Sequence, residues 1–175
     1  MRVFNYGINH IEMEAIETPT EVNEVNKLNG GLWACPETDY FSDWFVLLLY
    51  LPMMAKPDTT LGGNYIELSP NASILTLDVD NYHRYLVNGK LDVDQVLQYD
   101  VLHFTEALVD QVEAFESYYV ESYHILNKEA IKSIQREPID FFSLMNPTFK
   151  QQTLDVFITL KERVLKTSFY QSLHQ

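Results

Sequence analysis

Six short segments of aromatic and aliphatic residues, separated by turn-forming glycine, proline and asparagine, constrain the fold of this chain more than any other feature. Each is four to nine residues long, which is the usual length of a strand in a globular sheet. Their β-branched and aromatic residues also favour strands. The segments are residues 3–6, 32–36, 65–68, 74–77, 100–104 and 118–126.

Short helical patterns lie between these segments. Polar capping residues predict helices over residues 43–51, 79–87, 92–98 and 128–135, the second of them ended by Asn88-Gly89. Residues 8–16 fit either a strand or a loop, and residues 107–115 remain ambiguous. This mixture of strands and helices predicts an α+β fold.

The clearest helical periodicity lies near the C-terminus. Leu154, Phe157, Ile158, Val164 and Leu165 share one face of a helix, with mostly polar residues between them. We expect residues 138–175 to form a helical extension that packs on an α+β domain of residues 1–137. Self-association through this helix is the alternative.

The chain is strongly acidic. It carries 12 Lys and Arg against 25 Asp and Glu, a formal net charge of −13. Such a charge repels a phosphate backbone, so direct binding of nucleic acid is not expected. Because the acids are interspersed with apolar residues, the charge indicates solubility first. Imitation of nucleic acid or docking on a basic protein partner is the alternative.

Cysteine use and hydropathy indicate the compartment. Cys35 is the single cysteine, which excludes an intramolecular disulfide and a cysteine-rich zinc site. We expect a buried structural thiol, with a nucleophilic role as the alternative. The N-terminal residues lack the apolar core of a signal peptide, and the most apolar run, residues 44–55, is too short to span a membrane. These features predict a cytoplasmic protein without a membrane segment.

The motifs of the commoner enzyme classes are absent from the sequence. It contains no P-loop, no dinucleotide glycine motif, no zinc-protease helix motif and no calcium loop. The five histidines never stand two or four residues apart, so no pair of metal ligands is expected on one strand or helix face. We therefore predict no metal site, with a site assembled from residues distant in sequence as the alternative.

A group of acids surrounds the tyrosine-rich segment 118–126. Carboxylates beside aromatic rings can orient a ribose hydroxyl and stabilise an oxocarbenium-like centre. Solvated acids on an edge strand are the alternative interpretation. The acids are Glu113, Glu116 and Glu121, and the rings are those of Tyr118, Tyr119 and Tyr123.

The order of the motifs is similar to that of small uncharacterised proteins of bacteria and phages. Residues 30–36 read Gly-Gly-Leu-Trp-Ala-Cys-Pro and are followed by Trp44, like the Gly-Gly-Leu-Trp-x-Ser-Pro element and the Trp-containing helix of those proteins. The likeness continues at residues 65–75, 99–101 and 120–131, and it covers about residues 1–135. This architecture resembles the ADP-ribosyltransferase-like fold, in which NAD binds in a cleft between two small mixed sheets with flanking helices.

The resemblance implies roles for residues of the first two strands. The first strand of active transferases ends in a His or Arg that holds the NAD ribose, and here Asn5, followed by Tyr6 and Gly7, stands in that place. Asparagine can hydrogen-bond a ribose but carries no charge. In the second element, Trp33 would stack on nicotinamide and Cys35 replaces a hydroxyl residue.

The late strand supplies the expected catalytic glutamate. Glu121 or Glu116 would polarise the ribose 2′-hydroxyl while the glycosidic bond dissociates. The resemblance thus implies an NAD-binding protein that transfers ADP-ribose to a protein target. The alternative is a catalytically inactive, acidic inhibitor of phage or bacterial origin that blocks a basic partner.

Overall fold

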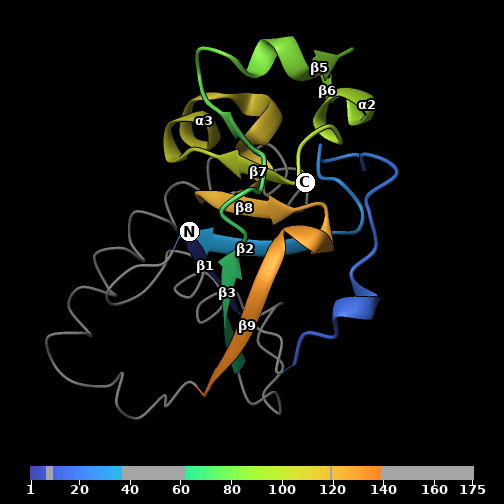
Figure 1. The fold of residues 1–175 in the computed structure, drawn as a ribbon. Coiled ribbons are helices and arrows are strands. Elements are labelled where there is room, and N and C mark those ends of the chain that lie inside the picture. Colours follow the sequence, from blue (N-terminus) through green and yellow to red (C-terminus); the bar gives the residue numbers. More distant parts are fainter. Residues whose placement is uncertain (7–9, 37–61, 119, 139–175) are drawn as a thin grey trace, which may run out of the picture.

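The computed structural model describes residues 1–6, 10–36, 62–118 and 120–138 (Figure 1). Its strands are β1 (Arg2–Tyr6), β2 (Leu32–Pro36), β3 (Gly62–Leu68), β4 (Ile74–Leu77), β5 (Leu86–Val87), β6 (Lys90–Leu91), β7 (Val101–Phe104), β8 (Ser122–Ile125) and β9 (Ile131–Pro138). Its helices are α2 (Val93–Val96) and α3 (Glu106–Gln111), together with the 3-10 helices η1 (Met13–Ala15), η2 (Tyr82–Tyr85), η3 (Glu113–Tyr118) and η4 (Lys128–Ala130). The expected helix over residues 43–51 and, apart from Pro138, the expected C-terminal extension lie outside the described residues.

Seven of these strands form one mixed sheet in the order β4-β7-β8-β2-β1-β3-β9. β4 and β7 are parallel, and the other neighbouring pairs of this sheet are antiparallel. In Figure 1, β7, β8 and β2 run across the view, whereas β3 and β9 run steeply down it, so the two halves of the sheet turn strongly relative to each other. A strand-rich sheet with few, short helices confirms the α+β class for the described part of the chain.

All six predicted strand segments contain strands. β1, β2, β3, β4 and β7 lie within one to three residues of the expected bounds. β8 is shorter than expected, because residues 113–118 form η3 and only residues 122–125 pair with neighbouring strands. The expected strand 118–126 is thus correct in kind and wrong at its beginning.

The predicted helix over residues 128–135 is wrong. The Asn127 side chain does accept a hydrogen bond from the Glu129 backbone N–H, as a helix cap would, but the helix ends after η4. Residues 131–138 instead form β9, which pairs with β3 from Gly62 to Leu68. The long-range ladder outweighs a helical preference that is worth only a few tenths of a kcal/mol per residue.

The predicted helix over residues 79–87 is also wrong in extent. Residues 82–85 form η2, and the chain then enters the hairpin β5–β6. Asn88 and Gly89 have φ angles of 53° and 78°, which place them at the two central positions of the hairpin turn. The left-handed preference of this pair is therefore used in a turn between strands and not at the end of a helix.

The sheet separates two clusters of buried residues, because successive side chains of a strand point to opposite faces. We call the face covered by α3 and η3 the helix face; its cluster includes Leu102, Phe104 and Tyr118. We call the opposite face, which packs on Ile11 and Ile16, the loop face. Its cluster includes Val3, Ile66, Val101, Tyr123 and Ile125.

In the described part of the chain, no helix is long and apolar enough to cross a bilayer.

Asn26 connects three segments that are distant in sequence. This residue is buried, and its backbone has a φ of 61°. Its side-chain amide nitrogen donates to the Ala114 carbonyl at 3.1 Å, and its side-chain oxygen accepts from the Leu91 N–H at 2.8 Å. The backbone carbonyl of Asn26 accepts from the Tyr118 hydroxyl, also at 2.8 Å. These bonds attach the loop before β2 to the hairpin and to η3.

Removal of the buried Tyr118 hydroxyl is therefore expected to destabilise the fold. Tyr118→Phe keeps the ring but leaves the Asn26 carbonyl without this donor, so we expect a loss of about 1–2 kcal/mol in the free energy of unfolding. The midpoint of urea denaturation measures this loss. An unchanged midpoint would show that the hydrogen bond contributes nothing net.

Candidate functional site

The three stretches that carry the predicted site residues are neighbours in the sheet. β2 pairs through Leu32, Trp33 and Ala34 with β8, and through Cys35 and Pro36 with β1. The first half of β2 thus pairs along one edge with β8 and the second half along the other edge with β1, so the two halves of the sheet meet at this strand. This junction brings the end of β1, the middle of β2 and the start of β8 close together.

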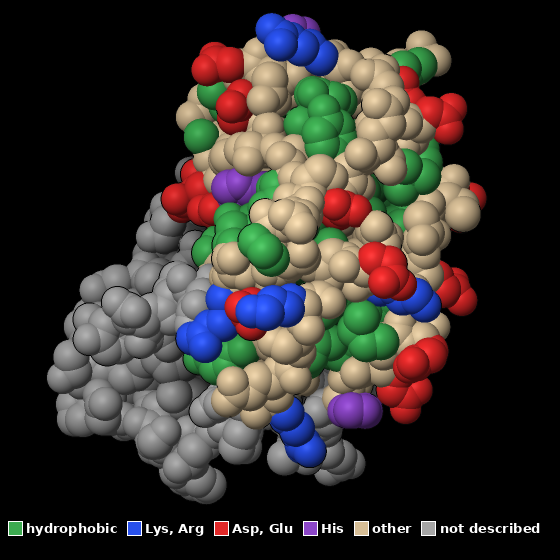
Figure 2. All heavy atoms as spheres, viewed as in Figure 1, with side chains coloured by type: hydrophobic (Ala, Val, Ile, Leu, Met, Phe, Trp, Pro, Cys, Tyr) green, Lys and Arg blue, Asp and Glu red, His purple; other side chains and the backbone are tan. Residues whose placement is uncertain are grey.

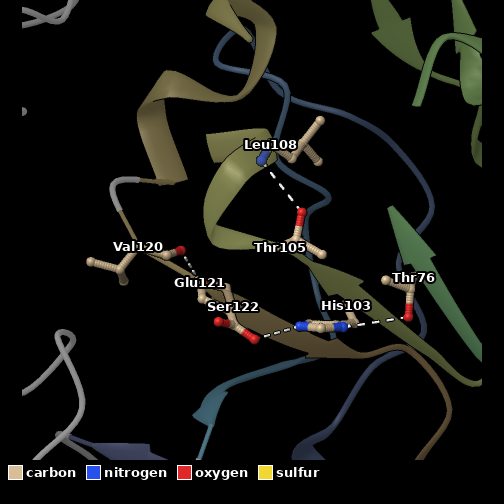
Figure 3. A network of polar contacts seen from close by, with 7 residues as sticks. All are labelled: Thr76, His103, Thr105, Leu108, Val120, Glu121 and Ser122. Carbon is tan, nitrogen blue, oxygen red and sulfur yellow. Dashed lines mark hydrogen bonds and ion pairs between the residues drawn. The ribbon is translucent and has the colours of Figure 1, made fainter. Parts of the chain in front are cut away.

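Glu121 lies directly before β8, and its carboxylate is held in place by β7. Its Oε1 lies 2.6 Å from Nε2 of His103, a distance at which the imidazole N–H donates to the carboxylate (Figure 3). The Glu121 side chain is 35% exposed and that of His103 is 16% exposed, so the carboxylate remains open to a ligand.

His103 is itself fixed by two neighbours on the loop face. Its ring stacks on the ring of Tyr123, with centroids 4.3 Å apart and planes 4° from parallel. Its Nδ1 lies 3.4 Å from the hydroxyl of Thr76 on β4. Burial, and then the charge of Glu121, raise the pKa of Tyr123. The stacking on Tyr123 and the contact with Thr76 hold the imidazole in one orientation, in which it presents one N–H to Glu121.

Asn5 lies at the junction between β1 and β2. Its amide nitrogen donates to the backbone carbonyl of Trp33 at 2.7 Å, and its position in β1 pairs with Asn64 of β3. Its side-chain oxygen is buried and, among the residues that the structure describes, has no hydrogen-bond partner. An unpaired buried acceptor costs on the order of 1–3 kcal/mol, so this oxygen is a candidate ligand contact.

Trp33 points to the other face of the sheet. It is paired with His124 of β8, and the two rings stack with centroids 3.8 Å apart and planes 16° from parallel. The Tyr118 and Phe104 rings lie 5.4 and 6.1 Å away. Glu121 stands three residues before His124, an odd number, so strand alternation places it on the loop face. The structure therefore does not bring the Trp33 ring together with Glu121.

The Gly30-Gly31 pair has a local structural purpose. The Gly30 carbonyl lies 2.8 Å from Nε2 of His124, which donates to it. Gly31 has a φ of +67°, and a Cβ there would lie 2.4 Å from the same Nε2. The buried His124 ring is thus enclosed by both glycines and by Trp33. Burial, together with the nearby charge of Lys27, lowers the pKa of His124 to about 4, although the bond to Gly30 acts in the opposite direction.

The remaining predicted residues lie elsewhere. Cys35 is buried and in no disulfide, and its Sγ donates to the Phe4 carbonyl at 3.0 Å, as a structural cysteine does. Glu116 lies on η3 and lines a separate depression of about 650 Å³. Tyr6 belongs to β1, and Gly7 lies outside the described residues. Among the described residues, no three His, Cys, Asp or Glu side chains are grouped so that they could hold a metal ion.

Sequence reasoning missed His103 and Asn64 as members of this region. His103 stands in a strand that reads as apolar, two residues after the buried Val101 and on the same face. A polar residue within an otherwise apolar strand is unusual, and this could have marked His103 as a candidate site residue. Nothing in the sequence shows that this histidine lies opposite Tyr123 and beside Glu121.

Comparisons with protein-family models, with curated proteins and with solved structures find no match to this chain.

Proposed function

We propose that this chain binds NAD or a related nucleotide on the loop face and acts as an ADP-ribosyltransferase-like protein on a protein target. One observation carries the proposal: the partly exposed Glu121 carboxylate is held by His103 beside a junction where, among the described residues, Asn5 has an unpaired buried oxygen. A fixed carboxylate and a free acceptor are both suited to ribose hydroxyls, which donate hydrogen bonds.

The shape of the sheet also supports a nucleotide site at this junction. In the ADP-ribosyltransferase-like fold, NAD lies between two small sheets, and here the two halves of the sheet turn away from each other at β2, the strand that joins them.

The proposed chemistry assigns a different role to each residue. The Glu121 carboxylate accepts the 2′-hydroxyl hydrogen of the ribose and stabilises the positive charge that develops as the bond to nicotinamide breaks. His103 is a positioning residue that keeps this carboxylate in one orientation. Trp33 does not stack on nicotinamide in this proposal; it holds β2 against β8 through His124. A nucleophile of the target protein then takes the ADP-ribosyl group, and nicotinamide leaves.

The decisive test compares two glutamate variants. We expect calorimetric binding of NAD and slow release of nicotinamide by the natural protein, detected by chromatography. Glu121→Gln removes the charge that the transition state needs, so nicotinamide release should fall by about 100-fold or more. Glu116→Gln, the matched control on η3, should leave the rate unchanged. If millimolar NAD gives neither heat nor a thermal shift, the proposal is wrong.

The acidic surface supports one second candidate, a non-catalytic protein that binds a basic partner. Glu24, Glu113 and Glu116 line the same 650 Å³ depression, with Lys90 as its basic side chain. This arrangement favours a cationic peptide segment over an anion. Triple replacement of the three glutamates by glutamine would abolish such binding and leave any NAD-dependent activity intact, so the two candidates are separable.

A further inference from the structure

A second depression, of about 370 Å³, lies on the loop face at the far edge of the sheet, between β9, β3 and the segment before η1. Its polar lining comes from three segments that are distant in sequence. The polar residues that line it are His10, Asn64, Lys132, Ser133 and Arg136. Among the described residues that line it there is no Asp or Glu, although the chain as a whole carries 25 of them.

The charge of this depression opposes that of the rest of the molecule. In Figure 2, Lys and Arg side chains gather over the lower half of the described part, which contains β3 and β9. Lys132 is paired with Glu67 at 2.7 Å, and this contact lowers the pKa of Glu67. Within the described part of the chain, Arg136 is exposed and makes no ion pair. Its guanidinium is therefore available to an anion.

The position of Arg136 connects this depression with the proposed nucleotide site. Arg136 of β9 pairs with Asn64 of β3, and Asn64 pairs with Asn5 of β1. The three residues thus form one cross-strand row on the loop face. Neighbouring strands lie about 4.8 Å apart, so Arg136 is about 10 Å from Asn5 along this row. A ribose and its attached phosphates span such a distance.

We propose that this depression binds the phosphate groups of the nucleotide, with Arg136 as the principal contact. An arginine guanidinium donates two parallel hydrogen bonds to a phosphate and keeps its charge at all physiological pH values. The ligand class is a pyrophosphate-bearing nucleotide whose ribose lies at Asn5. The identity of the nucleotide rests on the proposed function, whereas the phosphate contact can be tested alone.

Calorimetric titration with inorganic pyrophosphate, ADP-ribose and NAD tests the phosphate contact. We expect Arg136→Gln to weaken binding of all three by about tenfold or more, since a charge-assisted bidentate contact is lost. Arg84→Gln, which removes the same charge from the exposed end of η2, is the matched control and should bind as the natural protein does. Because Arg136 is exposed, its replacement should leave the thermal midpoint unchanged.

The outcomes separate this inference from the proposed function. Equal pyrophosphate binding by the Arg136→Gln and natural proteins, or no pyrophosphate binding at millimolar concentration, overturns the phosphate site. If pyrophosphate binds through Arg136 while NAD is not cleaved and Glu121→Gln has no effect, the phosphate site stands and the transferase proposal falls. If NAD is cleaved at an unchanged rate and affinity by Arg136→Gln, the transferase proposal stands and the phosphate site falls.

Discussion

Replacement of Gly31 by alanine is expected to lower the free energy of unfolding by about 3–5 kcal/mol, or to prevent folding. Two costs add at this position. The backbone has a φ of +67°, which an alanine adopts only with strain. The new Cβ would also lie 2.4 Å from His124 Nε2 and 2.8 Å from the Ile125 carbonyl oxygen, distances that real Cβ atoms do not show. The midpoint of urea denaturation measures the total.

Gly89→Ala separates these two costs. Gly89 has a similar φ of +78°, but a Cβ there would meet nothing within 4 Å. Alanine at this turn should cost only the backbone strain, about 1–2 kcal/mol. The difference between the two variants then measures how tightly His124 is enclosed. Equal losses for both variants would contradict the close approach of the Gly31 backbone to the His124 ring.

The second large effect is a loss of stability in mild acid that depends on His124. Burial lowers the pKa of this histidine from 6.5 to about 4 in the folded chain. Between these two pH values the unfolded chain binds the proton and the folded chain does not. The free energy of unfolding should therefore be highest above pH 6.5 and fall as the pH decreases towards 4. The contribution is about 3 kcal/mol across this window.

Chemical denaturation at several pH values measures this dependence. Carboxylates titrate in part of the same window, so the informative quantity is the difference between the natural protein and His124→Gln. Glutamine can still donate to the Gly30 carbonyl but does not take up a proton, so the slope between pH 6.5 and 4 should become shallower. His83→Gln, which changes an exposed histidine, should keep the natural slope. A natural slope in His124→Gln would refute a buried, neutral imidazole.

Both predictions concern the Gly-Gly-Leu-Trp element, which the structure explains without a ligand. Gly30 supplies a carbonyl to His124, Gly31 leaves room for its ring, and Trp33 stacks on it. Leu32 packs on the other face of the sheet with the loop-face cluster. A motif that suggested nicotinamide stacking thus serves to join β2 to β8. The residues proposed to contact a ligand, Glu121 and Asn5, lie near this motif in space but outside it in the sequence.

Much of the fold was predictable because strand propensity and turn residues are local signals. The aromatic and β-branched segments became strands, and Asp92 caps a short helix within the predicted range of residues 92–98, whereas the helix that Thr105 caps falls where the pattern was ambiguous. The prediction failed at residues 128–135, where a good capping residue, Asn127, precedes a strand. Only the presence of β3 as a partner decides this case, and no window of sequence around Asn127 contains that information.

The sequence by itself determined the class of fold, the acidic character of the chain and the short list of residues with suitable chemistry, since these depend on composition and local pattern. The tertiary structure decided which of those residues face each other. Strand register turned Trp33 towards the helix face and Glu121 towards His103, and it aligned Arg136 with Asn64 and Asn5. The physical reason is that side chains alternate along a strand, so a pairing between distant segments fixes the face on which each residue lies.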